Sequence, residues 1–228
     1  MRLSVIIPCL DEAEAITGLM QALQPLRLRG VEVIVADGGS ADGTLELARP
    51  LASHAVSAPR GRAAQMNHGA AMATGDVLLF LHADCRLPEA ADERILQGLA
   101  ATRRQWGRFD VRLAGKHPML RMIALAMNAR SRWTGIATGD QGLFVRRSTF
   151  EAAGRYPDIP LMEDIALCKR LKRFGRPLCL PEHITASARR WEQHGIAATI
   201  LLMWRLRLAY SLGADPRRLA ALYAPHRS

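Results

Sequence analysis

The sequence predicts an α/β fold built on a doubly wound sheet with helices on both faces. Segments with strand and helix character alternate over the first 84 residues. The strand segments are short apolar runs, and polar clusters stand at their carboxyl ends, where open α/β sheets bind ligands. At 228 residues the chain is long enough for one sizeable α/β domain and short for two. We therefore expect one domain with a C-terminal appendage.

Each element of the first half has a local signal. Residues 3–8 form an apolar, β-branched run typical of a buried strand, and Asp11 with Glu14 three positions later resembles a capping box that starts a helix. That helix has apolar residues at helical spacing and is expected to end at Pro25. The other elements expected here are strands at 31–36, 54–57 and 77–81 and helices at 42–51 and 62–73.

The second half is less regular. The expected elements are helices at 90–103, 118–130, 163–174 and 196–212 and strands at 108–113 and 143–145. The helix at 163–174 is the clearest, because acids occupy its first turn, bases its last, and Gly175 and Pro177 follow as stop signals. The longest largely apolar run, residues 196–204 with Thr199 as its one polar residue, is much shorter than the roughly 20 residues of a membrane-spanning helix.

The charge balance favours an anionic partner. The chain has 31 Lys and Arg against 21 Asp and Glu, a net charge of +10. These bases, nearly all arginine, are scattered rather than gathered on one element, so nucleic-acid binding is not expected. The four cysteines have no metal-type spacing and the chain begins without a signal peptide, so a cytoplasmic location is expected.

The common phosphate-binding loops are absent. Neither GxGxxG nor GxxxxGK(S/T) occurs, and the turn from Pro8 to Glu12 contains no glycine with which the backbone could wrap a phosphate. Phosphate charge must then be met by a divalent cation on a strand-end carboxylate, assisted by arginines. A sugar nucleotidyltransferase is disfavoured, because it would need a Gly- and Arg-rich loop at this turn.

Four segments together resemble family-2 glycosyltransferases of the GT-A fold, over most of the chain. They are residues 4–12, residues 36–44 with Asp37-Gly38-Gly39-Ser40, residues 61–84 ending at Asp84, and the pair Glu163-Asp164. The resemblance implies a GT-A-like (Rossmann-like) mixed, mostly parallel sheet flanked by helices, with a C-terminal helical extension. It divides the chain into a domain of residues 1–195, with a nucleotide-binding half (1–87) and an acceptor half (88–195), and a helical appendage (196–228).

The resemblance also implies an activity, the transfer of a sugar from a UDP- or GDP-sugar to an acceptor hydroxyl, inverting the anomeric centre. Asp164 matches the base that deprotonates the acceptor, and Glu163 beside it would raise its pKa. The alternatives are a helix cap for Asp11, a turn residue for Asp37 and a dipole-stabilising acid for Asp164. The expected nucleotide-sugar contacts are Pro8, Asp11, Glu12, Asp37, Arg62, Asn67 and Arg190.

A metal site with Mn²⁺ or Mg²⁺ is expected at Asp84, which matches the last carboxylate of the family's metal motif. His82 replaces the first carboxylate, and as a nitrogen ligand it favours Mn²⁺; a hydrogen-bonded, half-buried histidine is the alternative. His194 is a third candidate ligand, equally interpretable as a helix-start residue. The missing carboxylate leaves open a non-catalytic nucleotide-sugar-binding protein.

The turn Gly139-Asp140-Gln141 is suited to hydrogen-bonding the hydroxyls of a sugar or acceptor, and an ordinary tight turn is the alternative. With residues 189–195 it resembles a bacterial subgroup labelled arsenosugar-biosynthesis-type glycosyltransferases. The Met-rich helix at 118–130, and the last helix with Arg205 and Arg207, permit peripheral contact with the inner face of a membrane and would suit a lipid-linked acceptor. Core packing is the preferred interpretation of the Met-rich helix.

Overall fold

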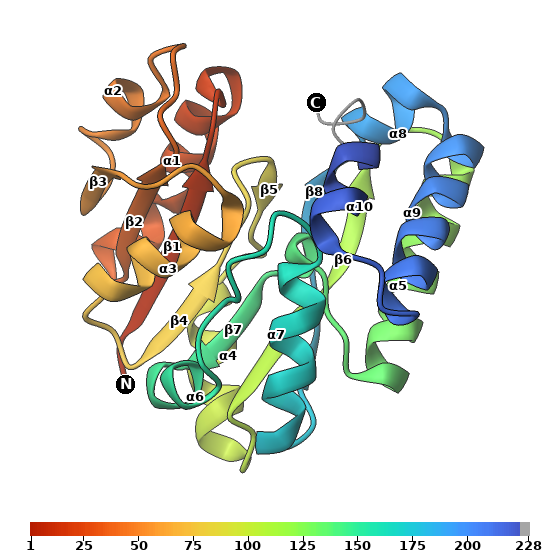
Figure 1. Ribbon diagram of the computed structural model, residues 1–228. Coiled ribbons are helices and arrows are strands. Elements are labelled where there is room, and N and C mark those ends of the chain that lie inside the picture. The colour runs from red at the N-terminus through yellow and green to blue at the C-terminus, as the bar shows by residue number, and fades with distance from the viewer. Residues whose placement is uncertain (224–228) are drawn as a thin grey trace.

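The opening strand lies in the middle of the sheet. In the computed structural model, which describes residues 1–223, β1 (Leu3–Cys9) pairs in parallel with β2 (Glu32–Asp37) on one side and with β4 (Val77–Phe80) on the other (Figure 1). β3 (His54–Ser57) continues the sheet in parallel beyond β2. The carboxyl ends of these strands therefore reach the same edge of the sheet.

The other half of the sheet contains antiparallel pairs. β7 (Leu143–Arg146) runs antiparallel to β4 and to β6 (Trp106–Ala114), β6 is parallel to β8 (Leu178–Ser187), and β5 (Cys85–Arg86) is antiparallel to β8. The order is β3-β2-β1-β4-β7-β6-β8-β5. The predicted mixed, mostly parallel sheet is confirmed, although β4 is parallel to its neighbour on one side only.

Helices cover both faces of this sheet (Figure 1). They are α1 (Ala13–Leu28), α2 (Thr44–Ala48), α3 (Arg62–Met72), α4 (Ala91–Ala101), α5 (Pro118–Thr134), α6 (Arg147–Ala152), α7 (Glu163–Leu171), α8 (Arg189–His194), α9 (Ile196–Ser211) and α10 (Pro216–Tyr223), with short 3-10 segments η1 (Gly139–Gln141) and η2 (Lys172–Phe174). Among residues 1–223, no helix combines the length and the apolar character needed to cross a membrane. The end of the predicted appendage, residues 224–228, lies outside the described residues.

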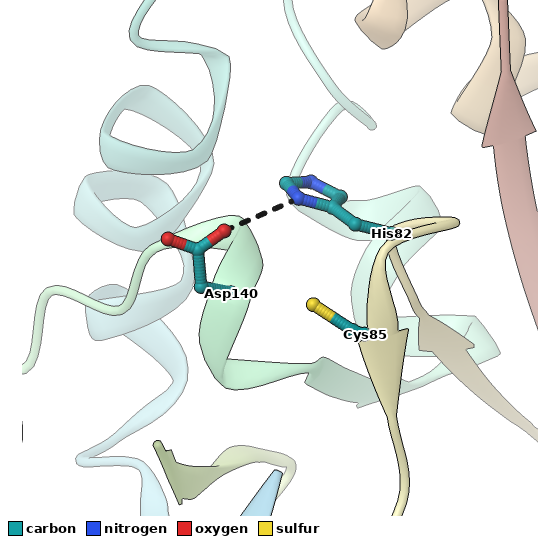
Figure 2. Close-up of side chains that lie close together, drawn as sticks. All are labelled: His82, Cys85 and Asp140. Carbon is teal, nitrogen blue, oxygen red and sulfur yellow. Dashed lines mark ion pairs between the residues drawn. The ribbon is translucent and has the colours of Figure 1, made fainter. Parts of the chain in front are cut away.

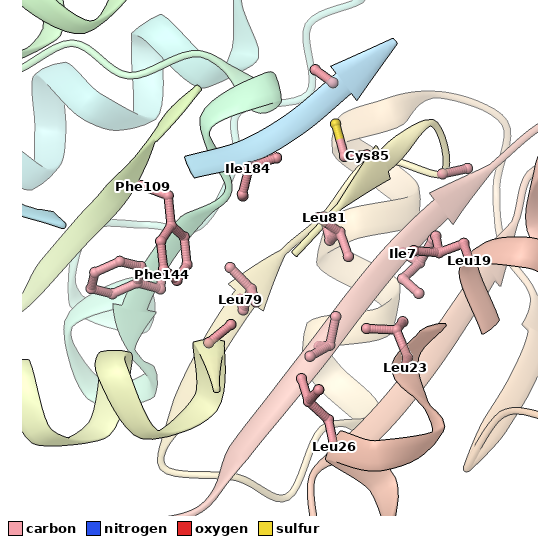
Figure 3. Packing of buried hydrophobic residues seen from close by; sticks show 14 of the residues in the cluster. Ile7, Leu19, Leu23, Leu26, Leu79, Leu81, Cys85, Phe109, Phe144 and Ile184 are labelled. Carbon is pink, nitrogen blue, oxygen red and sulfur yellow. The ribbon is translucent and has the colours of Figure 1, made fainter. Parts of the chain in front are cut away.

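Alternate residues of the central strands supply two separate cores. Ile7 of β1 lies in a cluster with α1, α4 and α5, whereas Ile6 lies in a second cluster with α3, α6 and α7. This period of two is what a strand buried on both faces requires. Figure 3 shows the first cluster, with Ile7 facing Leu19 and Leu23 of α1. A third cluster joins α9 and α10 to the start of α7.

Two helices differ from the sequence prediction. α1 does not end at Pro25 but continues to Leu28. Leu23 and Leu26, on either side of the proline, are both buried, so packing outweighs the hydrogen bond that proline removes. α2 is shorter than the predicted helix at 42–51, and just before its start Asp42 accepts hydrogen bonds from the N–H and the hydroxyl of Thr44.

Five of the α-helices and strands in residues 1–223 have no counterpart in the sequence prediction: β5, β8, α6, α8 and α10. β8 contains Pro181, which weakens its strand pattern. The pairing of β8 with β6 shifts register between Phe109 and Asp110, so Pro181 and Glu182 lie in a bulge where no ladder hydrogen bond is required. Tertiary pairing, rather than local sequence, therefore defines this strand.

β6 carries a fully buried arginine. The Arg108 guanidinium forms an ion pair with Asp110 and donates to the carbonyl oxygen of Asn128 at 3.2 Å. The second carboxylate oxygen of Asp110 accepts from Arg132 at 2.5 Å. A charge taken out of water is tolerated only with partners of this kind.

We predict that Asp110→Asn lowers the free energy of unfolding by about 3–5 kcal/mol, because it leaves the charge of Arg108 buried without compensation. Chemical denaturation measures this loss. The double variant Arg108→Met/Asp110→Asn should recover part of it, since it removes the buried charge as well. A double variant less stable than the single one would contradict this explanation.

Candidate functional site

The loops that follow β1 and β2 are tied to each other at the shared edge of the sheet. The Asp11 N–H donates to the Ser40 hydroxyl at 2.9 Å, and the Asp11 carboxylate accepts from the N–H of Ala41 at 2.9 Å. The Glu12 N–H donates to the Thr44 hydroxyl at 2.8 Å. Asp11 adopts a left-handed backbone conformation (φ 54°), which aspartate tolerates better than most residues. These hydrogen bonds hold the loops after β1 and β2 together at the edge where open α/β sheets bind ligands.

The carboxylate of Asp37 orders its own turn. It is 2% exposed and accepts hydrogen bonds from the N–H groups of Gly39 and Ser40, both at 2.9 Å, and from the Ser40 hydroxyl. The side chain thus has the turn role that the sequence left as an alternative, and its nucleoside contact remains a prediction. Pro8 is a buried residue of β1, in register with Ala36 of β2.

The side chain of Glu12 faces a group of charges from other elements. Burial and the charge of Asp84 raise the pKa of Glu12, while Arg189, Arg62 and His82 oppose the rise. These interactions bring together the turn after β1, the end of β4, the start of α3 and the start of α8. Glu12 and Arg62 were both predicted as site residues, and they share this space.

Asn67 and Gln65, both on α3, brace the backbone around the site. The Asn67 amide donates to the Tyr156 carbonyl oxygen at 2.8 Å and accepts from the Tyr156 N–H at 3.0 Å. Gln65, which the sequence did not single out, donates to the carbonyl oxygens of Cys9 and Ala36 at the ends of β1 and β2. Asn67 therefore anchors the loop before α7, and its predicted nucleoside contact stays untested.

A cluster of potential metal ligands lies where β4 ends. The Nδ1 of His82 is 3.4 Å from a carboxylate oxygen of Asp140, and the Cys85 thiol completes a group whose ligand atoms all lie within 4.8 Å of one another (Figure 2). The exposed Asp84 is adjacent, since its carboxylate accepts from the Cys85 thiol at 3.5 Å. His194 is not a member of this cluster in the described chain. The sequence missed Cys85, although it directly follows Asp84.

The carboxylate of Asp140 is kept ionised by its neighbours. Burial acts to raise its pKa, but the interaction with His82 and the charges of Arg190 and Arg62 outweigh burial and lower it. Burial raises the pKa of the Cys85 thiol well above its usual range, so that sulfur is protonated at neutral pH. The oxygen and nitrogen atoms suit a hard or borderline cation better than a thiol does.

Gly139 connects this cluster to the start of α7. Its N–H donates to the Asp164 carboxylate at 3.2 Å, and a Cβ at this position would collide with the imidazole ring of His82. The backbone of η1 thus fits between a histidine and a carboxylate from distant parts of the chain. Gln141, predicted to contact a sugar or acceptor, instead points inward: it is fully buried and its amide donates to Asn128 and Ser131 of α5.

Asp164 lies in the first turn of α7 with a perturbed carboxyl group. Burial, with the charge of Glu163 adding to it, raises the pKa of Asp164 to about 6. Glu163 faces Arg62, with an oxygen to nitrogen distance of 3.9 Å. The preceding Met162 is buried and has a left-handed conformation (φ 69°), a strained geometry for a residue with a side chain. The predicted base and its predicted neighbour thus lie beside Arg62 and the η1 segment that contains Asp140.

The C-terminal helices close the other side of the site. Arg190 of α8 lies with its guanidinium 5.0 Å from the ring centroid of Tyr223 on α10. His194 is at the end of α8. A cavity of about 670 Å³ begins at Asp140 and Arg190 and runs between α5 and α9. Arg130 of α5, at the end of the predicted Met-rich helix, also lines this cavity.

Comparison with known proteins places this geometry in context. The family model described as glycosyl transferase family 2 matches residues 4–152. Succinoglycan biosynthesis protein ExoA of Rhizobium meliloti (strain 1021) is 30% identical over 191 residues, which cover 75% of this chain and 58% of that protein. Probable glycosyltransferase YdaM of Bacillus subtilis (strain 168) is 27% identical over 237 residues, 93% of this chain and 55% of that protein. The chain thus spans little more than half the length of these relatives.

Solved structures show the same fold. TarS of S. aureus has a TM-score of 0.68 at 17% sequence identity, covering 83% of this chain and 61% of that one. The mannosyltransferase PcManGT from Pyrobaculum calidifontis, in complex with GDP-Man and Mn²⁺, has a TM-score of 0.65 at 23% identity, covering 91% and 61%. The predicted GT-A-like fold is confirmed.

We predict that Gly139→Ala displaces the His82 ring and separates it from Asp140, because the new methyl group requires the space that the imidazole occupies. The ring is the mobile end of a side chain, so the melting temperature should change little. Nitrogen NMR shifts of the His82 imidazole measure the displacement. Gly18→Ala is the matched control, since nothing lies within 4 Å of a Cβ there. Unchanged His82 shifts in Gly139→Ala would contradict the contact.

Proposed function

This chain belongs to glycosyl transferase family 2, and we propose that it transfers a sugar from a UDP- or GDP-sugar to an acceptor hydroxyl, inverting the anomeric centre. The observation that carries the proposal is the convergence, through Gly139, of the Asp164 carboxylate with the His82–Asp140 pair, with Arg62 near both carboxylates. The donor class has support from structures of the same fold: TarS is known in complex with UDP and with UDP-GlcNAc, and PcManGT with GDP-Man.

The reaction needs a base and a stabilised leaving group. The acceptor oxygen forms a bond to the anomeric carbon on the face opposite the diphosphate, the bond from that carbon to the diphosphate oxygen breaks, and the nucleoside diphosphate leaves with the electron pair. Asp164 receives the proton of the acceptor hydroxyl. With a pKa of about 6 it is largely ionised at neutral pH yet more basic than an ordinary aspartate. Arg62 offers positive charge to the diphosphate.

The residues at the end of β4 fit a divalent cation. His82, Asp84 and Asp140 supply one imidazole and two carboxylates, a set suited to Mn²⁺ and, through the oxygens, to Mg²⁺. When bound, such an ion would neutralise charge on the leaving diphosphate. His194 remains a predicted ligand outside the cluster.

The arrangement also bears on the non-catalytic alternative. That alternative rests on the absence of the first carboxylate of the metal motif, where the chain has His82. Asp140, from a different segment, places a carboxylate oxygen 3.4 Å from the His82 ring. A carboxylate is therefore available beside that position, and this favours the enzyme.

Our first functional prediction is that the protein with Mn²⁺ releases nucleoside diphosphate from at least one donor in a panel of UDP- and GDP-sugars. Asp164→Asn should lower the rate by about 10²–10⁴-fold, as loss of a general base does, while the affinity for the donor changes little. Released diphosphate measures the rate and calorimetry the affinity. Asp158→Asn, an exposed aspartate, is the control. A panel without turnover or binding would refute the proposal; lost donor binding in Asp164→Asn would give Asp164 a structural role.

Our second functional prediction concerns pH. The rate should rise as pH increases through about 6, because Asp164 accepts a proton only in its ionised form. Glu163→Gln removes the neighbouring negative charge that raises this pKa, so the midpoint should move to lower pH. Rates measured from pH 4.5 to 8 test the shift, with the exposed Glu46→Gln as control. A midpoint unchanged in Glu163→Gln would show that another group controls the rate.

A further inference from the structure

Of the residues that line the cavity between α5 and α9, only Asp140 and Arg190 are assigned above to the donor or its metal ion. We propose that this cavity binds an amphiphilic acceptor, in which an anionic group of phosphate type lies between the reacting hydroxyl and a long apolar chain. The inference rests on the proposed function, because it assigns the class of the acceptor. It is carried by the shape of the cavity, by three arginines within it, and by its continuity with the site.

The walls of the cavity suit an apolar chain. Methionines 119, 122 and 127 of α5 face Ile200, Met203 and Trp204 of α9 across a volume of about 670 Å³. This size is typical of pockets that bury most of a ligand. Flexible, polarisable methionine side chains adapt to an apolar ligand of irregular shape. A saturated chain would gain about fourfold in affinity for each methylene it buries.

Three arginines line the same cavity with unused donors. They are Arg130, Arg190 and Arg207. The Nε atoms of all three, and one terminal nitrogen of Arg130, are buried and have no hydrogen-bond partner among residues 1–223. Buried donors without partners are costly, and guanidinium groups match the oxygens of a phosphate. An anionic ligand in the cavity would bring acceptor oxygens to the guanidinium groups that line it.

The order of groups along the cavity matches an acceptor for this site. Asp140 and Arg190 line the cavity, and Asp140 directly follows Gly139, whose N–H donates to the Asp164 carboxylate. Burial lowers the pKa of Arg130, and the charge of the nearby Asp164 carboxylate opposes this shift more than any other charge does. An anion held by the arginines would therefore place a hydroxyl near the base, while its chain extends towards Met119 and Trp204.

A second copy of the chain or a membrane surface would account for fewer of these observations than an amphiphilic molecule does. Met122 and Trp204 are 69% and 73% exposed, so a second copy of the chain or a membrane surface could cover this rim. Neither would place an acceptor atom beside arginine donors that are buried inside the cavity. The combination of a recessed cationic region and an apolar channel favours a single amphiphilic molecule.

Alkyl phosphates test the proposal directly. Hexyl, octyl and decyl phosphate, each below its micelle concentration, are titrated by calorimetry and by tryptophan fluorescence, since Trp191 and Trp204 line the cavity. We expect affinity to rise about fourfold per methylene until the cavity is full. Inorganic phosphate has only the anionic group, and octanol has the apolar chain without it. Each should bind at least tenfold more weakly than octyl phosphate.

Matched variants locate the binding. Ile200→Glu places a charge in the apolar wall, and Arg207→Gln removes one cationic donor group; each should weaken octyl phosphate binding about tenfold or more. Leu208→Glu and Arg205→Gln make the same changes at exposed positions of α9 that do not line the cavity, and should leave it unchanged. Circular dichroism confirms that all four variants fold.

The proposal is overturned if octyl phosphate binds no better than inorganic phosphate, or if the controls weaken binding as much as the cavity variants. Sedimentation with phosphatidylglycerol vesicles without binding of monomeric alkyl phosphates would overturn it in favour of a membrane-docking face. Concentration-dependent dimers lost in Ile200→Glu, without alkyl phosphate binding, would overturn it in favour of a second copy. A parallel titration with the nucleotide-sugar donor distinguishes failure of the acceptor proposal from failure of the proposed function. If the donor binds and alkyl phosphates do not, only the proposed class of acceptor is refuted.

Discussion

The close approach of Gly139 to His82 and Asp164 is the contact on which the rest of the site depends. His82 follows β4, and Asp164 lies in the first turn of α7. Only a residue without a Cβ can let the imidazole lie against the backbone while its N–H reaches the carboxylate. A single backbone segment thus sets the distance between the groups that would bind a cation and the group that would accept a proton.

Two aspartates close to this segment have pKa values shifted in opposite directions. Asp140, one residue from Gly139, has its pKa lowered by His82 and two arginines despite burial, whereas burial and Glu163 raise the pKa of Asp164. Acid and base roles are assigned in proteins by environments that move neighbouring pKa values apart. Asp140 therefore remains negative and suited to a cation, while Asp164 can exchange a proton near neutral pH. Both are aspartates, so only their surroundings distinguish them.

Much of the fold, but less of the site, could be predicted from the sequence. Apolar runs identified β1, β2 and β4 because strands buried on both faces need no alternation. β8 was missed because Pro181 breaks its pattern and pairing with β6 restores it. Within the candidate site, local motifs predicted roles for His82 and Asp164, but the pairing of His82 with Asp140 and the inward turn of Gln141 arise from tertiary contacts. No spacing in a sequence encodes those contacts.

The C-terminal helices connect the cavity to the base. α9 has apolar residues on nearly every side, yet only Thr199 and Leu206 are buried, so most of its apolar surface faces the cavity or solvent. Leu206 belongs to the cluster that contains Met162 and Ile165, on either side of Glu163 and Asp164. The strained backbone of Met162 persists only if its surroundings hold it. Packing of α9 and α10 supplies that restraint, so a ligand that displaced α9 would also change the position of Asp164.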